Sequence, residues 1–400
     1  MQHIVIVGGG FGGIKAAREL AKHPELFKVT LISDEDCFRY YPALYRTASG
    51  HSKRESCIAI ELLIHDLKNV TFLQGKASKI DRATKRITLE DGSTVQYDKA
   101  IFALGVITSY FGIPGMKEYS HGLKTMEELD QLHKDLHEEF VDDRMPDKNY
   151  VIVGAGPTGV ELAASLRSYL RQIAKWHHAR SNKITLELIE AAPRILPRSH
   201  QKGSELAAKR LHKLGIKMMP GKKVEAETAD SLMVSGRSIP TRTVIWTAGV
   251  TNNPFYESNK TQFSLNERGR VTVNRFMQVD DSLFVIGDNA DTPHAGLALT
   301  AVRDARYVVQ QIVRTTKGKS LQAYHQKTPI TVIPIGHKWA LVEYGPLVFG
   351  GWPGGLLRWL ADLVAYKDIM PLGQAFSLWR NDKAYEDDGC EICAQAQFKH

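Results

Sequence analysis

The first thirteen residues constrain this chain more than any other stretch of its sequence. Residues 3–7 (HIVIV) form a short apolar run rich in β-branched side chains, which predicts a strand buried on both faces. The run leads directly into GGGFGG at positions 8–13, and residues 14–21 have the pattern of a helix. This order of strand, glycine loop and helix is typical of a dinucleotide-binding unit, in which the helix N-terminus offers free N–H groups to a pyrophosphate.

Each glycine of this loop has its own expected task. Gly8, Gly10 and Gly13 occupy the three fixed positions of G-x-G-x-x-G, and Phe11 and Gly12 complete the loop. The first glycine permits the tight turn, the second lets the backbone approach a pyrophosphate, and the third lets helix and strand pack closely. An ordinary glycine-rich turn is the alternative interpretation, and the flanking strand and helix argue against it.

The same pattern returns near the middle of the chain. An apolar strand at residues 151–153 leads into a second glycine loop, and residues 160–170 again have the pattern of a helix. The second loop, GAGPTG, contains Gly154, Gly156, Pro157, Thr158 and Gly159. Two such loops in the same context are an internal repeat. The sequence therefore predicts an α/β protein with two Rossmann-like dinucleotide-binding domains.

An acidic residue after the second strand of each unit is expected to bind the adenosine ribose. In the first unit this strand spans residues 29–33 and ends at Ser33, so the acid, Asp34, comes one residue later than ideal. In the second unit the strand at 184–189 is followed by Glu190 in the expected position. An acid there repels a 2′-phosphate, so Glu190 favours NADH over NADPH. An ordinary surface glutamate is the alternative.

Three further apolar strands end at small residues, where backbone can meet a cofactor. They lie at residues 97–105, 244–250 and 281–288, and the last is followed by a helical pattern at 297–314. The residues at the three strand ends are Ala103 and Gly105, Ala248 and Gly249, and Gly287 and Asp288. The chain thus returns to its first domain after completing the second.

A chain of 400 residues exceeds one ordinary hydrophobic core, so several domains are expected. The two repeats place a discontinuous first domain at residues 1–115 and 265–325 and a second domain at 116–264. Residues 326–400 remain as a C-terminal region for membrane anchoring or dimerisation.

The charge and the cysteines limit the partners and the compartment. The net charge of +8 suits an anionic membrane surface, whereas the scattered basic residues and the lack of a recognisable module argue against nucleic acid. Four cysteines are few for this length and favour a reducing compartment over a disulfide framework. The first strand begins at once, without room for a signal peptide, and no apolar run of about 18 residues is present. We therefore expect a peripheral protein on the cytoplasmic face of the cell membrane.

These pieces together resemble the two-dinucleotide-binding-domain flavoproteins and, within them, the type II NADH:quinone dehydrogenases. The resemblance rests on YPALY at 41–45, YFGIPG at 110–115, GAGPTGVELA at 154–163, LIEAAPRILP at 188–197 and WTAGV at 246–250. It implies FAD at the first loop with Asp34, Ala103, Gly105, Gly287 and Asp288, and NADH at the second loop with Glu190, Ala248 and Gly249. The implied reaction passes a hydride from NADH to FAD and then two electrons to a membrane quinone, without proton pumping.

The resemblance also implies residues for the quinone side. Glu161, at the start of the helix after the second loop, would lie near the flavin and nicotinamide and act in catalysis. An acid stabilised by the helix dipole is the alternative reading of Glu161. The family usually carries an Ala-Gln…Gln motif after Gly-Asp, and here Ala298, Leu299 and Arg303 stand at those positions. We expect these three residues at the quinone site, with an altered headgroup preference.

The C-terminal region contains an amphipathic helical pattern that fits an anchor lying in a membrane surface. Its apolar members are Leu356, Leu357, Trp359, Leu360, Leu363 and Val364, and Arg358, Asp362 and Lys367 are its polar members. A helix that packs between domains or in a homodimer is the alternative, and a homodimer is expected.

Other functions remain open from sequence alone. A soluble NADH-dependent flavin oxidoreductase could use oxygen, a thiol or a protein as acceptor, and a flavoprotein could also bind NADH only as a sensor. Cys390 and Cys393 form a lone C-x-x-C that admits a redox or metal role. The fifteen histidines form no pair with a nearby acid that indicates a metal site, so no metal is expected.

Overall fold

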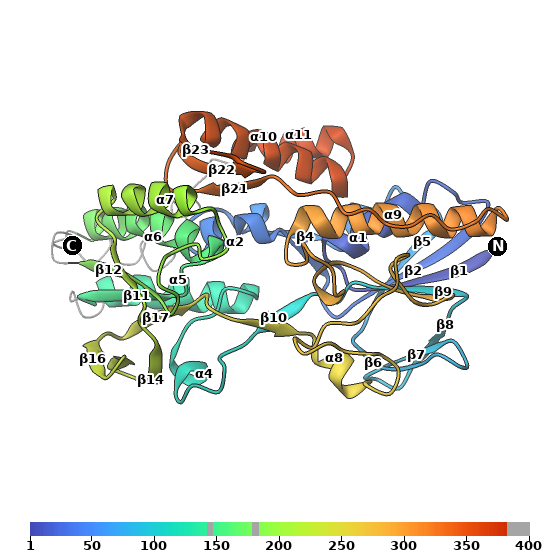
Figure 1. Cartoon of the computed structure of the whole chain (residues 1–400), viewed down its shortest axis with the longest axis horizontal. Coiled ribbons are helices and arrows are strands. Elements are labelled where there is room, and N and C mark those ends of the chain that lie inside the picture. Colours follow the sequence, from blue (N-terminus) through green and yellow to red (C-terminus); the bar gives the residue numbers. More distant parts are fainter. Residues whose placement is uncertain (142–146, 178–183, 382–400) are drawn as a thin grey trace.

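The computed structural model describes residues 1–141, 147–177 and 184–381. Two sheets, one parallel and one parallel apart from its antiparallel edge strand, lie towards opposite ends of an elongated molecule, and the C-terminal helices cross over one side of it (Figure 1). The mixed α/β class expected from the repeat is confirmed.

The first sheet is built around the strand that precedes the first glycine loop. Its order is β19 (Gln278–Asp280), β20 (Leu283–Val285), β9 (Lys99–Phe102), β1 (Gln2–Val7), β2 (Phe27–Ser33) and β5 (Val70–Gln74). Strand β1 pairs in parallel with both β2 and β9, so that Ile4 lies opposite Val29 and Lys99. Because helices cover both faces, residues 4–7 are fully buried, which explains their continuous apolar run.

The second sheet repeats this arrangement with fewer strands. Its order is β13 (Lys217–Pro220), β12 (Thr185–Glu190), β11 (Asn149–Val153) and β17 (Thr243–Trp246), all parallel. Strand β11 lies between β12 and β17 as β1 lies between β2 and β9. Helices α1 (Phe11–Leu20) and α6 (Pro157–Trp176) begin within the two glycine loops. The repeat seen in the sequence is therefore a repeat of structure.

Small antiparallel units complete both halves. They are β3 (Cys37–Arg39) with β4 (Cys57–Ala59); β6 (Ala77–Asp81), β7 (Arg86–Leu89) and β8 (Thr94–Gln96); and β14 (Val224–Thr228), β15 (Ser231–Val234) and β16 (Arg237–Pro240). Strands β10 (Val106–Thr108) and β18 (Val250–Asn252) pair where the chain passes between the two sheets (Figure 1).

Further helices cover the sheets or lie in the connections. They are α2 (Tyr41–Thr47), η1 (Lys53–Glu55), α3 (Ile60–Ile64), α4 (Met116–Tyr119), α5 (Met126–Val141), α7 (Gln201–Lys213), α8 (Pro254–Ser258), η3 (Gly287–Asn289) and α9 (Ala298–Thr316). Helix α9 packs against α1 over the first sheet, so the chain returns to its first half after completing the second, as the sequence predicts.

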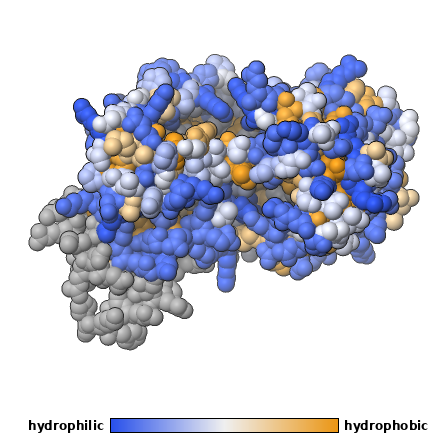
Figure 2. Space-filling model, turned by 90° about the horizontal axis from the view of Figure 1, so that it is seen from below, coloured by the Kyte–Doolittle hydropathy of each residue, from blue (hydrophilic) through white to orange (hydrophobic). Residues whose placement is uncertain are grey.

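The C-terminal part adds a small sheet and two helices. The sheet contains β21 (Thr331–Pro334), β22 (Ala340–Tyr344) and β23 (Leu347–Gly351), and α10 (Trp352–Ile369) and α11 (Leu372–Asn381) follow it. Helix α10 packs against β22 and α1, while Trp352, Leu356 and Val364 remain exposed on its outer side. The face of the molecule turned away from these helices is largely hydrophilic (Figure 2). Within the described ranges, no helix is both long and apolar enough to cross a membrane.

Two features of the structure differ from the sequence-based expectations. Cys37 and Cys57, in a chain where no disulfide framework is expected, form a disulfide, because β3 and β4 pair and bring their Cα atoms to 5.6 Å. Of the polar positions of α10, only Lys367 is exposed, whereas Asp362 is buried and the Arg358 side chain is nearly so. Cys390 and Cys393 lie outside the described residues.

Candidate functional site

The first glycine loop is held by backbone contacts that only glycine permits. A Cβ atom on Gly8 would lie 2.2 Å from the Ala103 carbonyl oxygen, and Gly8 has a positive φ of 118°. A Cβ on Gly13 would lie 1.8 Å from the Gly8 carbonyl oxygen. Gly12 packs on Ile286, which directly precedes Gly287. Strand, helix and neighbouring strand therefore meet at van der Waals distance.

Gly10 differs from these glycines because its surroundings are open. No atom lies within 4 Å of the Cβ that an alanine would have there. Gly10 is the N-cap of α1 and makes no side-chain cap hydrogen bond, and the first N–H groups of a helix have no partner within the helix. An open position beside a helix N-terminus, which a Cβ would fill, fits a pyrophosphate approaching the backbone.

The second loop reproduces this geometry. A Cβ on Gly154 would lie 2.5 Å from the Ala248 Cα, and a Cβ on Gly159 would lie 1.8 Å from the Gly154 carbonyl oxygen. Gly156 caps α6 and has open space around it, as Gly10 does. Pro157 and Thr158 are exposed beside Gly156. The two loops therefore offer the same anion-binding geometry at two places.

Glu190 lies directly against the second loop. Its carboxylate accepts hydrogen bonds from the backbone N–H groups of Ala155 and Ala192, each at 2.8 Å. The carboxylate is thereby fixed between the loop and the end of β12. This is the position from which an acid reaches the ribose of a dinucleotide bound to the loop.

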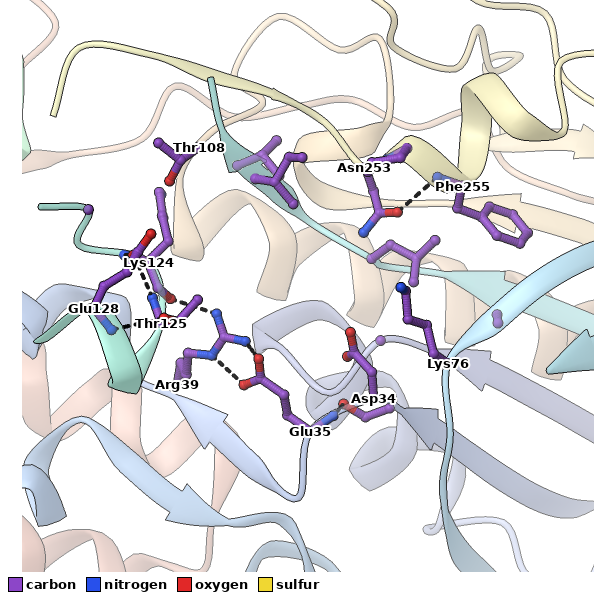
Figure 3. Close-up of a pocket in the computed structure, with 18 of the residues that line it drawn as sticks. Asp34, Glu35, Arg39, Lys76, Thr108, Lys124, Thr125, Glu128, Asn253 and Phe255 are labelled. Atoms are coloured by element: carbon purple, nitrogen blue, oxygen red, sulfur yellow. Dashed lines mark hydrogen bonds and ion pairs between the residues drawn. The ribbon is translucent and has the colours of Figure 1, made fainter. Parts of the chain in front are cut away.

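A large pocket of about 930 Å³ opens beside the first loop. It extends from Gly8 at the end of β1 to Tyr110 and His121, between the two sheets. Figure 3 shows Asp34 and Lys76 pointing towards each other in its wall. The ion pair that Lys76 forms is with Glu90, at 2.8 Å, and this contact raises the pKa of Lys76. The volume and the paired charges fit the adenosine part of a dinucleotide.

A second set of polar contacts forms the other side of this pocket. Arg39 pairs with Glu35 and donates to the backbone oxygen of Lys124 at 2.6 Å (Figure 3). Glu128 accepts from the N–H groups of Lys124 and Thr125 at 2.6 and 3.0 Å. The Lys124 ammonium lies over the Tyr41 ring, 4.9 Å from its centroid. These contacts join β3, α2 and the start of α5 around one cavity.

The two cofactor-facing strand ends of the first sheet are joined by Asn289, which the sequence analysis missed. Its amide accepts from Gly105 N at 2.9 Å and donates to Gly105 O at 2.6 Å and to Asn252 Oδ1 at 2.6 Å. Asn289 is fully buried and directly follows Gly287 and Asp288. It therefore fixes the turn at Gly105 relative to Asp288 and to strand β18. Its position next to the Gly-Asp pair was the only available sequence signal.

The expected quinone residues lie at the start of α9. Leu297 is the N-cap of this helix, and Ala298 and Leu299 open it, partly exposed. Arg303 donates to the backbone oxygen of Lys327 at 3.0 Å, so its guanidinium is held on the connection that follows α9. Asp304, fully buried, accepts from Gly287 N and from the Tyr324 hydroxyl at 3.1 and 2.6 Å. Burial raises the pKa of Asp304 to about 6.

Glu161 lies on the first turns of α6, on the side that faces α2 and α10. Its charge environment consists of Arg358, Asp362, Arg46 and Tyr45. Burial raises the pKa of Glu161 to about 8, although the two arginines oppose this shift. A carboxyl group that keeps its proton at neutral pH can donate that proton to a substrate oxygen.

Two substitutions in the first loop separate folding from cofactor binding. Gly13→Ala should lower the melting temperature of the cofactor-free protein by several degrees, because the new Cβ overlaps the Gly8 carbonyl. Gly10→Ala should leave that melting temperature within about one degree of the wild type, since space is open, while reducing dinucleotide affinity at least about tenfold. Differential scanning fluorimetry and flavin titration measure the two effects. Equal loss of stability in both variants would contradict the assignment of Gly10.

The raised pKa of Glu161 also predicts a pH-dependent stability. The folded protein holds this proton up to about pH 8, while the unfolded chain releases it near its ordinary pKa of 4.5. Wild-type stability should therefore fall relative to Glu161→Gln as the pH rises from about 4.5 to about 8, and the difference should then remain constant. Thermal melts across this range measure it, with the exposed Glu205→Gln as control. A difference that does not change with pH would show that Glu161 ionises normally.

Comparison with known proteins agrees with this geometry. Residues 2–305 match the family model described as pyridine nucleotide-disulphide oxidoreductase. A type II NADH:quinone oxidoreductase of Mycobacterium tuberculosis is 29% identical over 393 residues, covering 91% of this chain and 84% of the relative. One of Staphylococcus aureus is 24% identical over 397 residues, covering 93% and 97%. The resemblance drawn from the motifs is thus confirmed.

Solved structures share the fold. The structure of NDH2 from Plasmodium falciparum in complex with NADH has a TM-score of 0.84 at 17% identity, covering 96% of this chain and 98% of that chain. The sulfide:quinone oxidoreductase of Aquifex aeolicus has a TM-score of 0.78 at 19% identity, covering 97% and 94%. With the family model matched over both glycine loops, the chain belongs to the pyridine nucleotide-disulphide oxidoreductase family.

Proposed function

We propose that this chain is an FAD-dependent NADH:quinone oxidoreductase. The observation that carries the proposal is the pair of equivalent loops, in which Gly10 and Gly156 each leave open space at a helix N-terminus. Two dinucleotide sites in one chain suit a reaction between two dinucleotides. The curated relatives named type II NADH:quinone oxidoreductase support the choice of NADH and quinone as substrates.

FAD is assigned to the first loop, where the 930 Å³ pocket lies. When bound, FAD can accept a hydride and release two electrons. Gly10 and the N-terminus of α1 would hold the pyrophosphate of FAD. Asp34 and Lys76 would face the adenosine end, and Asp288, beside Gly287, would face the ribityl chain. The division into residues 1–115 with 265–325, 116–264 and 326–400 belongs to the same proposal.

NADH is assigned to the second loop. Gly156 and the exposed Pro157 and Thr158 would meet its pyrophosphate, while Glu190 would accept from the ribose hydroxyl groups. Ala248 and Gly249, at the end of β17, would allow the nicotinamide to pass close to the backbone. The protein contributes mainly the relative position of the two rings.

The quinone is assigned to the side of Glu161 and the start of α9. The overall reaction, NADH + H⁺ + quinone → NAD⁺ + quinol, takes one proton from the medium. Glu161 would give this proton to a quinone oxygen and regain it from water. Arg303, held by Lys327, can donate to a quinone oxygen but cannot accept, and Leu299 can do neither.

Rapid mixing of the purified yellow protein tests this function. NADH should bleach the flavin under anaerobic conditions, and a water-soluble quinone should then restore its absorbance within a turnover time. Reoxidation by oxygen or by a thiol acceptor, with no response to quinones, would replace the quinone assignment by a soluble flavin oxidoreductase. Reduction without reoxidation by any acceptor would instead indicate an NADH sensor.

Glu190 should set the nucleotide preference. Wild type should reduce its flavin at least about tenfold faster with NADH than with NADPH, because the carboxylate repels the 2′-phosphate. Glu190→Gln should narrow this ratio, while Glu205→Gln on the exposed side of α7 should not change it. Stopped-flow reduction with both nucleotides provides the measurement. Equal wild-type rates with NADH and NADPH would refute the role of Glu190.

The outer side of α10 and α11 is assigned to a membrane surface, at the cytoplasmic face of the cell membrane. Its exposed apolar side chains are Trp352, Leu356, Leu357, Trp359, Leu360 and Val364 on α10 and Leu372 and Phe376 on α11. The net charge of +8 suits anionic lipid. A quinone dissolved in the bilayer would then approach from the same side of the molecule.

Replacement of exposed apolar side chains tests whether this surface binds membranes, and it leaves the buried side of α10 intact. The double variant Leu356→Glu and Val364→Glu should lose most binding to anionic lipid vesicles, while flavin reduction by NADH stays within about twofold of wild type. Leu62→Glu, on an equally exposed leucine of α3, should bind vesicles normally. Vesicle co-sedimentation and light scattering distinguish the outcomes. Unchanged vesicle binding with loss of a dimer would assign the surface to a second copy of the chain.

A further inference from the structure

A buried cluster of charged side chains ties the inner side of α10 to α2. At its centre is Asp362, which is 1% exposed. Its carboxylate accepts a hydrogen bond from the Tyr40 hydroxyl at 2.6 Å and pairs with Arg358 at 3.0 Å. Arg46, on α2, approaches its second oxygen at 3.5 Å. One acid thus holds two arginines that come from different helices.

Both arginines have further partners that fix their orientation. Arg46 pairs with the buried Glu55 at 3.1 Å, and Arg358 donates to the backbone oxygen of Pro42 at 3.0 Å. Two arginines and two acids, Asp362 and Glu55, balance in charge. Apart from His51, whose Nδ1 lies 3.9 Å from a Glu55 carboxylate oxygen, the cluster is therefore neutral as long as any further acid beside it carries a proton.

Glu161 is that further acid. It lies one turn before Ser165 on α6, and Ser165 shares a hydrogen bond with Ser49, just after α2. The side of α6 that carries Glu161 thus packs on the end of α2. Glu161 is partly buried and has no hydrogen-bond partner among the described residues, and the charges that act on it are those of Arg358, Asp362 and Arg46. Tyr45 of α2 completes the ionisable groups facing it.

Burial is the largest influence that keeps Glu161 neutral, and the charges around it adjust this balance. Arg46 and Arg358 favour its carboxylate, whereas Asp362 opposes it. As long as Asp362 engages both guanidinium groups, its negative charge offsets part of the effect that their positive charge has on Glu161.

We propose that Asp362 is a positioning residue for Glu161: it holds Arg46 and Arg358 in place and offsets part of their positive charge, so that Glu161 carries the proton delivered to quinone. The proposal rests on the function proposed above for Glu161.

The competing explanation is that the ion pair between Asp362 and Arg358 only stabilises the packing of α10, without tuning Glu161. Substitutions at the two paired residues distinguish the two explanations. Asp362→Asn should lower the midpoint of Glu161 titration by about one pH unit, because an opposing negative charge is lost. Arg358→Gln should raise the midpoint by a similar amount, because a favourable positive charge is lost. A purely stabilising ion pair predicts the same change in the midpoint for both variants, since each variant breaks the same pair.

Two further variants are matched controls. Asp362→Glu keeps the charge and should restore a midpoint close to wild type. Asp368→Asn breaks another tie of α10, the 2.8 Å pair with Lys15 of α1, and should leave the midpoint unchanged. If Asp362→Asn does not fold, Arg46→Gln and Arg358→Gln replace it, and each should raise the midpoint of the Glu161 titration.

The titration is read by infrared spectroscopy of the purified flavoprotein, following the protonated carboxyl band that disappears in Glu161→Gln. Opposite shifts for Asp362→Asn and Arg358→Gln support the proposal, and shifts in the same direction or no shift overturn it. The pH profile of quinone turnover is measured in parallel. Opposite infrared shifts with an unchanged turnover profile would keep the positioning role and remove Glu161 from the quinone step.

Discussion

The close approach of Gly13 to the carbonyl oxygen of Gly8 is the constraint on which the structure depends. With no side chain at Gly13, helix α1 packs directly against β1, and the open position at Gly10 lies at its N-terminus. The same contact between Gly159 and Gly154 sets α6 against β11. Each half of the molecule therefore presents an anion site at the carboxyl ends of its strands, where parallel sheets place their ligands.

Much of this arrangement follows from short stretches of sequence. The glycine loops, their strands and helices, and Glu190 beside the second loop were predicted because each depends on residues close together in the chain. Asp34 was predicted only as an acid one position late, and the structure places it in the pocket wall opposite Lys76. The disulfide between Cys37 and Cys57 was missed, since it requires the pairing of two short strands.

Contacts between distant segments could not be predicted in this way. Asn289 joins Gly105 and Asn252, which are far from it in sequence, and nothing in its own surroundings indicated those partners. In the sequence Asp362 is one of the polar members of an amphipathic helical pattern, whereas in the structure it is the buried centre of a cluster formed with Tyr40 and Arg46. A polar residue within an apolar helix pattern either faces solvent or is buried with polar partners, and only the tertiary structure distinguishes the two cases.

Helix α10 thus has two sides with different tasks. Its outer side exposes large apolar residues, and its inner side places Arg358 and Asp362 beside Glu161. Glu161 itself belongs to α6, so the proposed membrane surface and the proposed proton donor lie on two different helices. Arg358 and Asp362 are the residues of α10 whose charges act on Glu161.

In the proposed function the two loops hold two different dinucleotides, and a substitution in the second loop distinguishes their roles. Calorimetric titration of the oxidised flavoprotein with NAD⁺, which cannot reduce the flavin, would be compared for wild type and Gly156→Ala. We expect that Gly156→Ala retains one FAD per chain and binds NAD⁺ at least about tenfold more weakly than the wild type. Loss of FAD from Gly156→Ala, with unchanged NAD⁺ binding by the protein that retains it, would contradict the assignment of the loops.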